Sequence, residues 1–196
     1  ELDARIRGES SDRAVEVFYQ VETLVIGLAV ERALAPERFI VGYREPQAEL
    51  PAAYAGFLGR FGCPVLRMRY ESAELAKLAV NMFLASSVCT TNTLAELCEA
   101  IGADWREIVP ALTSDRRIGP HAYVQPGLGL SGGNLERDLA TFIELARRRG
   151  TDAGIVETWR ANRARRRDWG LDGLRAQGLD RPEAVIAVWG LAYKAG

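Results

Sequence analysis

The chain is 196 residues long, 48% hydrophobic and nearly neutral, with 25 Lys and Arg residues against 26 Asp and Glu residues. This balance gives no global reason to expect a nucleic-acid or acidic-lipid partner, and no apolar run approaches bilayer length, so we expect no membrane span. Cys63, Cys89 and Cys98 have no metal-ligand spacing and form no even set, which predicts no metal site, no disulfide framework and a cytoplasmic home.

The first part of the chain alternates between two kinds of pattern. Residues 14–20, 38–43 and 64–69 are rich in β-branched and aromatic residues, as is typical of strands. Residues 49–61 have the apolar spacing of an amphipathic helix. Strands alternating with helices predict a mostly parallel sheet. Three strands are few for a doubly wound sheet, and we identify no glycine-rich dinucleotide fingerprint anywhere in the chain, so residues 1–70 read as the last part of such a domain.

Residues 72–100 predict one long helix, the spine of a helical domain. No Gly or Pro interrupts them, apolar residues recur at helical spacing, Ser72 is a suitable N-cap and Gly102 a suitable stop. Lys77 and Asn81 are four positions apart and therefore share one face. Taken alone, the pair is compatible with a lysine that extends to solvent and an asparagine that satisfies a neighbouring backbone group.

Beyond Gly102 the pattern stays largely helical. Residues 104–112, about 134–149 and 151–176 predict helices, and a glycine-rich stretch covers 115–138. The arginine-rich run 160–167 could bind nucleic acid, but a solvated helix face fits the balanced charge better, and Asn162 reads as an ordinary helix amide. His121 lacks metal-binding neighbours. Residues 183–194 predict a buried strand that enters a tight turn.

With these pieces in order, the chain resembles the UDP-glucose/GDP-mannose dehydrogenase family of nucleotide-sugar dehydrogenases. The runs that carry the resemblance include V-E-T-L-V-I-G, A-E-L-A-K-L-A-V-N-M-F-L-A, S-D-R-R-I-G-P, P-G-L-G-L-S-G-G-N-L-E-R-D and W-G-L-A-Y-K. The resemblance implies α/β architecture with a dominant helical part. Residues 1–70 would be the C-terminal part of a Rossmann-like NAD-binding domain whose first half is absent, 71–182 an all-helical dimerisation domain, and 183–196 the first strand of a truncated nucleotide-sugar-binding domain.

The resemblance also implies roles for individual residues. Glu22 matches an acid–base glutamate, and Asp138 an aspartate that positions water or accepts protons. Lys77 and Asn81 match donors that stabilise an oxyanion or fix a water. For the substrate, the resemblance implies contacts from Arg117 (into the partner subunit), from Lys194, and from the glycines Gly127, Gly129, Gly132 and Gly133, which let backbone approach the sugar.

The departures from the family pattern concern the nucleophile. Aligned on Asp138, the chain has Asn134 where the family has its catalytic cysteine, and Glu136 and Arg137 where proline and lysine are usual. Because an amide nitrogen is a poor nucleophile, Asn134 cannot form the thiohemiacetal of the family's second oxidation. Val21 and Thr23 also replace the proline and the aromatic residue that flank the glutamate.

Two functions follow as hypotheses. The first is NAD-dependent oxidation of a nucleoside-diphosphate sugar alcohol that lacks the cysteine-dependent second step. The second is a catalytically inactive paralogue that serves as a dimerisation scaffold or a sugar-nucleotide sensor. In both cases we expect a homodimer through the 72–100 helix, a place in polysaccharide biosynthesis, and no activity from these 196 residues alone.

Overall fold

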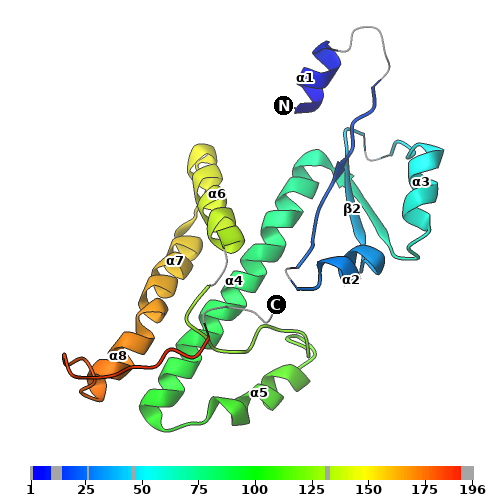
Figure 1. Cartoon of the computed structure of the whole chain (residues 1–196). Helices are drawn as coiled ribbons and strands as arrows, with labels where there is room; N and C mark the ends of the chain where they lie inside the picture. The colour runs from blue at the N-terminus through cyan, green and yellow to red at the C-terminus, as the bar shows by residue number, and fades with distance from the viewer. Residues whose placement is uncertain (1, 10–14, 26, 46, 131–132, 191–196) are drawn as a thin grey trace. The chain divides into compact units, whose positions relative to one another are not determined.

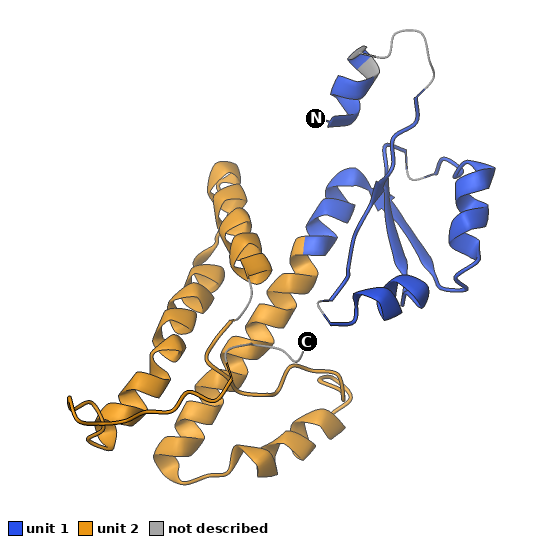
Figure 2. Ribbon diagram, in the orientation of Figure 1, with its two compact units in different colours: residues 1–77, 196 blue, residues 78–195 orange. Residues whose placement is uncertain are grey.

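The computed structural model describes residues 2–9, 15–25, 27–45, 47–130 and 133–190. The chain divides into two compact units, residues 1–77 and residues 78–195, which Figure 2 shows in separate colours. The boundary falls inside helix α4 (Tyr70–Ile101). A small sheet with helices, followed by an all-helical part, confirms the predicted fold class.

The first unit is built on a three-stranded sheet (Figure 1). Its strands β1 (Tyr19–Gln20), β2 (Phe39–Tyr43) and β3 (Val65–Arg69) stand in that order. The pair β2–β3 is parallel, in register from Phe39 opposite Val65 to Tyr43 opposite Arg69, as the sequence predicts. The pair β1–β2 is antiparallel, so the sheet is mixed.

The predicted strand 14–20 is wrong over most of its length, since only Tyr19 and Gln20 pair with β2. Val17 and Phe18 contact other residues of the first unit through side chains and not through strand hydrogen bonds. The hydroxyl of Tyr70 donates a hydrogen bond to the carbonyl of Val17, and the ring of Phe18 packs edge-on against Tyr43 with centroids 5.4 Å apart. These contacts hold residues 17 and 18 against the rest of the first unit without a strand ladder.

Strand β2 forms the centre of the first unit because it is buried on both faces. One face carries Val41 and Tyr43, which pack with Leu58 of helix α3 (Ala52–Gly59). The other face carries Ile40, which packs with Val21 and Ala73. Helix α2 (Ala29–Leu34) precedes β2, and helix α1 (Leu2–Glu9) lies at the start of the chain.

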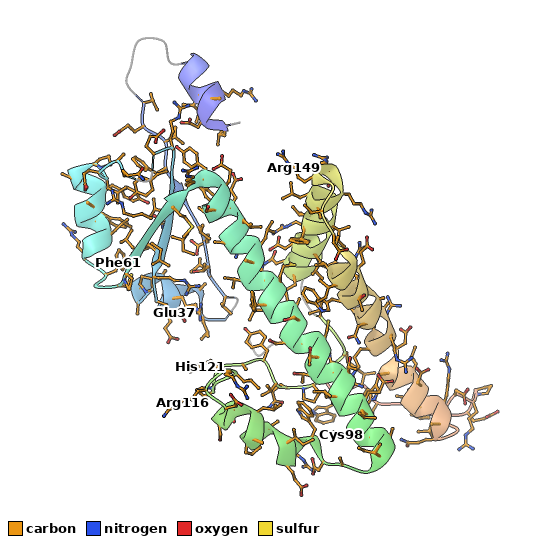
Figure 3. All side chains as sticks on the ribbon, turned by 180° about the vertical axis from the view of Figure 1, so that it is seen from behind. Glu37, Phe61, Cys98, Arg116, His121 and Arg149 are labelled. Carbon is orange, nitrogen blue, oxygen red and sulfur yellow. The ribbon has the colours of Figure 1, made fainter. Side chains whose placement is uncertain are left out.

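In the described part of the second unit, α4 is accompanied by four further helices. These are α5 (Trp105–Ser114), α6 (Gly133–Arg149), α7 (Gly154–Arg167) and α8 (Trp169–Ala176). Met82, Ala85 and Cys89 of α4 meet Leu139 and Ile143 of α6 in the main core, and Val156 of α7 joins them. A smaller cluster joins the end of α4 to α5 through Ala95, Cys98 and Trp105. Figure 3 shows Cys98 on the last turns of α4, and Arg116 and His121 on the segment that follows α5.

Two predictions for the C-terminal part are wrong. Residues 151–176 form two helices, not one, because the chain breaks at Asp168, and Gly170 and Gly173 directly beyond it lower helix propensity. Residues 184–190 contain no strand, and Val185 and Trp189 are 99% exposed. A strand needs a hydrogen-bonded neighbour, and none of the strands described here pairs with this segment.

The expectation that no apolar run approaches bilayer length is wrong for helix α4. At 32 residues it is long and apolar enough to cross a membrane, with a third of its most apolar window buried inside the protein. The core helix of a soluble protein meets the same criteria of length and composition, although such a helix is mostly buried. Ala85, Asn92 and Ala95 are almost fully buried in the second unit, whereas Phe83 and Ile101 are 77% and 68% exposed.

Candidate functional site

The second unit brings two predicted site residues together. Asn81 lies on α4 and Asp138 near the start of α6, and the amide of Asn81 donates a hydrogen bond of 2.5 Å from Nδ2 to Oδ2 of Asp138. Asp138 is only 8% exposed, while its neighbour Leu139 is fully buried and fixes this turn of α6 in the core. Nε of Arg137 lies 3.8 Å from the other oxygen, Oδ1, in a long ion pair. The carboxylate therefore keeps lone pairs for a substrate hydroxyl or a water. This geometry suits a proton acceptor or a water-orienting group.

Lys77 and Glu22 belong to the first unit. Lys77 is half-buried and lies one helical turn before Asn81 on α4, as predicted. Glu22 is exposed, and its Oε1 accepts the backbone N–H groups of Thr23 (2.7 Å) and Leu24 (2.9 Å). These bonds fix the orientation of the Glu22 carboxylate, which lines a small cavity of about 160 Å³ in the first unit.

Asn134, which the sequence predicts at the place of the family's catalytic cysteine, is the second residue of α6 and is exposed. Its Oδ1 accepts a hydrogen bond of 3.3 Å from Nη2 of Arg137. No thiol of the second unit replaces the missing nucleophile in an activated form. Burial raises the pKa of the Cys89 thiol to about 11, so it stays protonated at neutral pH. Cys98 is buried in the α4–α5 cluster.

Arg117 is not joined to Asn81 or Asp138 by any hydrogen bond in the described structure. It forms hydrogen bonds to Asp115 at 3.0 Å through Nε and 2.6 Å through Nη2, and its side chain is 88% exposed. These bonds lower the pKa of the Asp115 carboxyl. An exposed guanidinium held by its own loop is free to meet a second molecule.

The glycine-rich segment is anchored by residues that sequence reasoning missed. Gly127 donates its N–H to Oδ1 of Asn92 (2.8 Å), and its carbonyl accepts from Nε of Arg166 (2.9 Å). Nε of Arg163 donates to the carbonyl of Leu130 at 3.0 Å. The prediction of a solvated arginine face on α7 is therefore wrong for Arg163 and Arg166.

The sequence contains a signal for this arrangement. Val156, Trp159, Arg163 and Arg166 follow one another at intervals of three and four, so the two arginines continue the apolar stripe of α7. Asn162 is also engaged, since its Nδ2 donates to Oγ1 of Thr93 on α4 at 2.9 Å.

The predicted substrate glycines have different surroundings. Gly129 has φ +96°, and a side chain there would meet the backbone of α7, whereas Gly133 is the first residue of α6 with open space around it. Gly132 and Lys194 lie outside the described residues. The prediction that the chain has no glycine-rich dinucleotide fingerprint is wrong for the spacing alone, since Gly127, Gly129 and Gly132 are spaced as G-x-G-x-x-G. Residues 123–126, directly before it, contain no strand, so the context of a dinucleotide turn is missing.

Comparison with known proteins gives consistent matches. Residues 71–164 match the UDP-glucose/GDP-mannose dehydrogenase family, central domain. The chain is 35% identical to UDP-glucose 6-dehydrogenase of Pseudomonas aeruginosa, over 93% of this chain and 40% of that protein. It is 31% identical to UDP-glucose 6-dehydrogenase AglM of Haloferax volcanii, over 100% of this chain and 46% of that protein. The chain thus spans less than half the length of these relatives.

Solved structures agree with the sequence matches. The structure of a UDP-glucose dehydrogenase from Pyrobaculum islandicum superposes with a TM-score of 0.73 at 26% identity, over 91% of this chain and 40% of that one. A UDP-D-ManNAc dehydrogenase from Pyrococcus horikoshii gives a TM-score of 0.78 at 23% identity, over 98% of this chain and 46% of that one, and supports the fold.

Proposed function

The chain belongs to the UDP-glucose/GDP-mannose dehydrogenase family by its central domain, and on this premise we propose that the protein binds a nucleoside-diphosphate sugar and oxidises one of its alcohols. The observation that carries the proposal is the hydrogen-bonded pair Asn81–Asp138. Two helices hold an amide donor and a poorly exposed carboxylate together, directly after the glycine-rich segment.

The pair supports a division of labour in the oxidation. The Asp138 carboxylate accepts the proton of the substrate alcohol directly or through a water, while the Asn81 amide keeps that carboxylate oriented. The ammonium of Lys77 is a donor for negative charge that develops on the oxygen. Glu22 keeps the acid–base role that the family resemblance implies.

NAD is the oxidant that the family implies, but the described residues contain no glycine-rich turn between a strand and a helix that would hold its pyrophosphate. The described sheet has three strands, and none leads into a glycine-rich turn. NAD is therefore proposed as the oxidant of the whole protein.

We further propose that oxidation stops after one step. The family's second oxidation proceeds through a thiohemiacetal, and Asn134 has no sulfur with which to form it. Removal of one hydride and one proton from the alcohol leaves an aldehyde as the product. Arg137 donates a hydrogen bond to the side chain of Asn134, but this bond does not make the amide a nucleophile.

The alternative is an inactive paralogue that serves as a scaffold or a sensor of sugar nucleotides. A scaffold would act through the exposed apolar face of α4, formed by Leu75, Val80, Phe83, Leu94, Leu97 and Ile101. Both hypotheses include a homodimer through α4, because a second copy of this helix would cover that face. A cytoplasmic location and a role in polysaccharide biosynthesis stay predictions.

The test uses the whole protein with UDP-glucose and NAD, and measures both reduced cofactor and the oxidation level of the sugar product. We expect cofactor reduction with an aldehyde product. The variant Asn134→Cys should add carboxylate product, and Asn134→Ser, which is similar in size but lacks sulfur, should not. A carboxylate product from the unchanged protein would refute the single oxidation. Binding of UDP-glucose without cofactor reduction would favour the sensor.

A further inference from the structure

Two buried polar side chains from different helices grip the two backbone groups of one residue, Gly127. Asn92 of α4 is 1% exposed and accepts the N–H of Gly127, and Arg166 of α7 is 5% exposed and donates to its carbonyl. We call this arrangement the Gly127 clamp. None of the runs that carry the family resemblance includes Asn92 or Arg166.

Burial of the polar side chains of the clamp in the core has a free-energy cost. A guanidinium loses its hydration when it is buried, and its partners must compensate for that loss. Besides the Gly127 carbonyl, Arg166 has Glu99 at 3.6 Å and lies 4.8 Å above the ring of Trp169, but its Nη1 has no hydrogen-bond partner in the described structure. Nδ2 of Asn92 likewise has none. Apolar residues of similar size could fill this space without that cost.

What the clamp does is fix a segment that has no secondary structure of its own. Residues 123–127 contain neither helix nor strand. Oγ1 of Thr91 and Nε1 of Trp105 donate to the carbonyls of Tyr123 and Val124, and Arg163 holds the carbonyl of Leu130. The clamp lies between these anchors, so α4, α5 and α7 together determine the path of residues 123–130.

The segment ends beside the Asn81–Asp138 pair. Leu130 is 4% exposed and packs in the main core with Met82 and Leu139, the residues that directly follow Asn81 and Asp138 in the sequence. A shift of the segment at Gly127 would therefore reach the surroundings of the pair through the packing of Leu130.

We propose that Asn92 and Arg166 are positioning residues for substrate: they hold the glycine-rich segment in the one conformation that accepts the sugar part of a nucleoside-diphosphate sugar. This inference rests on the proposed function. It predicts that loss of the clamp weakens binding of the nucleotide sugar and leaves the helical core intact.

The test compares Arg166→Leu and Asn92→Leu in the whole protein with two matched controls. Arg167→Leu makes the same chemical change one residue further along, at an exposed side chain whose ion pair is to Asp168. Asn92→Asp keeps an oxygen that can accept the N–H of Gly127. Measurements are amide hydrogen exchange at Gly127, the melting temperature, and calorimetric affinity for UDP-glucose and for UDP alone.

We expect the two leucine variants to lose at least tenfold in exchange protection at Gly127 and at least tenfold in affinity for UDP-glucose. Affinity for UDP should change less than threefold, and the melting temperature should stay within a few degrees. The controls Arg167→Leu and Asn92→Asp should resemble the unchanged protein. If Arg166→Leu does not fold, Arg166→Lys keeps the charge but not the forked donor, and should show the same selective loss.

Other outcomes separate the two proposals. Full exchange protection at Gly127 in both leucine variants would overturn the clamp, and lost protection with unchanged affinity for UDP-glucose would overturn its positioning role. Equal losses for UDP and UDP-glucose, with a large drop in melting temperature, would show that the clamp acts on the fold alone. If the unchanged protein binds neither ligand, the proposed function is refuted, and the substrate role of the clamp with it.

Discussion

Replacement of Gly129 by alanine should unfold the second unit more easily, and the structure gives the size of the effect. Gly129 has φ +96°, where an L-residue is strained by about 1–2 kcal/mol. The new Cβ would lie 3.2 Å from the carbonyl oxygen of Arg163 and 3.5 Å from its Cα. Those backbone atoms belong to α7 and cannot rotate away, so overpacking adds about 1–3 kcal/mol.

The sum predicts a loss of about 2–5 kcal/mol in the free energy of unfolding, or about 4–20 °C in melting temperature for a protein of this size. Urea unfolding followed by circular dichroism measures the first quantity, and calorimetry the second. Gly127→Ala is the matched control, because Gly127 does not have positive φ and its new Cβ would meet nothing within 4 Å. Alanine there should be neutral or stabilising by about 0.4–1 kcal/mol.

The comparison decides why the segment contains glycine. If Gly129 serves only to let a sugar approach the backbone, Gly129→Ala should lose affinity for UDP-glucose and keep its unfolding free energy. A change below 0.5 kcal/mol in that free energy would refute the steric reasoning. Gly133, the first residue of α6, has open space at its Cβ position, so Gly133→Ala tests the approach of substrate without a steric cost to the fold.

Three further changes test other parts of the structure. Asn81→Ala leaves the poorly exposed Asp138 carboxylate without its amide donor, which should lower the free energy of unfolding by about 1–3 kcal/mol and also lower kcat. Asp138→Asn should lower kcat more and the free energy of unfolding less. Equal losses of stability in the two variants would contradict these roles. Burial raises the pKa of Cys89 to about 11 from an ordinary 9.0, so the thiol of the unfolded chain ionises first as the pH rises. The free energy of unfolding should therefore fall by up to about 2–3 kcal/mol between pH 9 and 11. This fall should vanish in Cys89→Ala. Phe83→Glu, at a side chain 77% exposed on α4, should convert a dimer into a monomer in light scattering without lowering helicity; an unchanged dimer would move the interface elsewhere, and binding of the unchanged protein to neutral lipid vesicles would favour a membrane role for α4.

The sequence predicts the long elements well. Helix α4 was expected over 72–100 and spans Tyr70–Ile101, because a long run free of Gly and Pro with helical apolar spacing has few alternatives. The same holds for α6, and for β2 and β3, whose bounds differ from the predicted ones by one residue or so.

Elements that depend on tertiary contacts could not be predicted from local pattern. Residues 14–18 have the composition of a strand, yet the carbonyl of Val17 accepts a hydrogen bond from the hydroxyl of Tyr70, more than fifty residues later. Gly170 and Gly173 lower helix propensity beyond Asp168, but α8 contains both glycines, so the local pattern alone does not place the division between α7 and α8. Val185 and Trp189 have the pattern of a buried strand but no neighbour to pair with among the described strands.

The candidate site divides in the same way. Asn81 and Asp138 were chosen for their match to a family motif, and their hydrogen bond across 57 residues supports the choice. Asn92 and Arg166 were missed because their role depends on the path of a segment without regular structure. Arginine in a basic run is ordinarily taken for a solvated residue, although its position in the stripe of α7 pointed inward.

The Gly127 clamp has a consequence for the order of folding. Its partners lie 35 and 39 residues from Gly127 in the sequence, on opposite sides of it. Helices α4 and α6 can form from local contacts, but residues 123–130 can become ordered only once α7 has docked on α4. Pulse-labelling during refolding should therefore show protection at Gly127 after protection in both helices, so that the glycine-rich segment is completed among the last parts of the second unit.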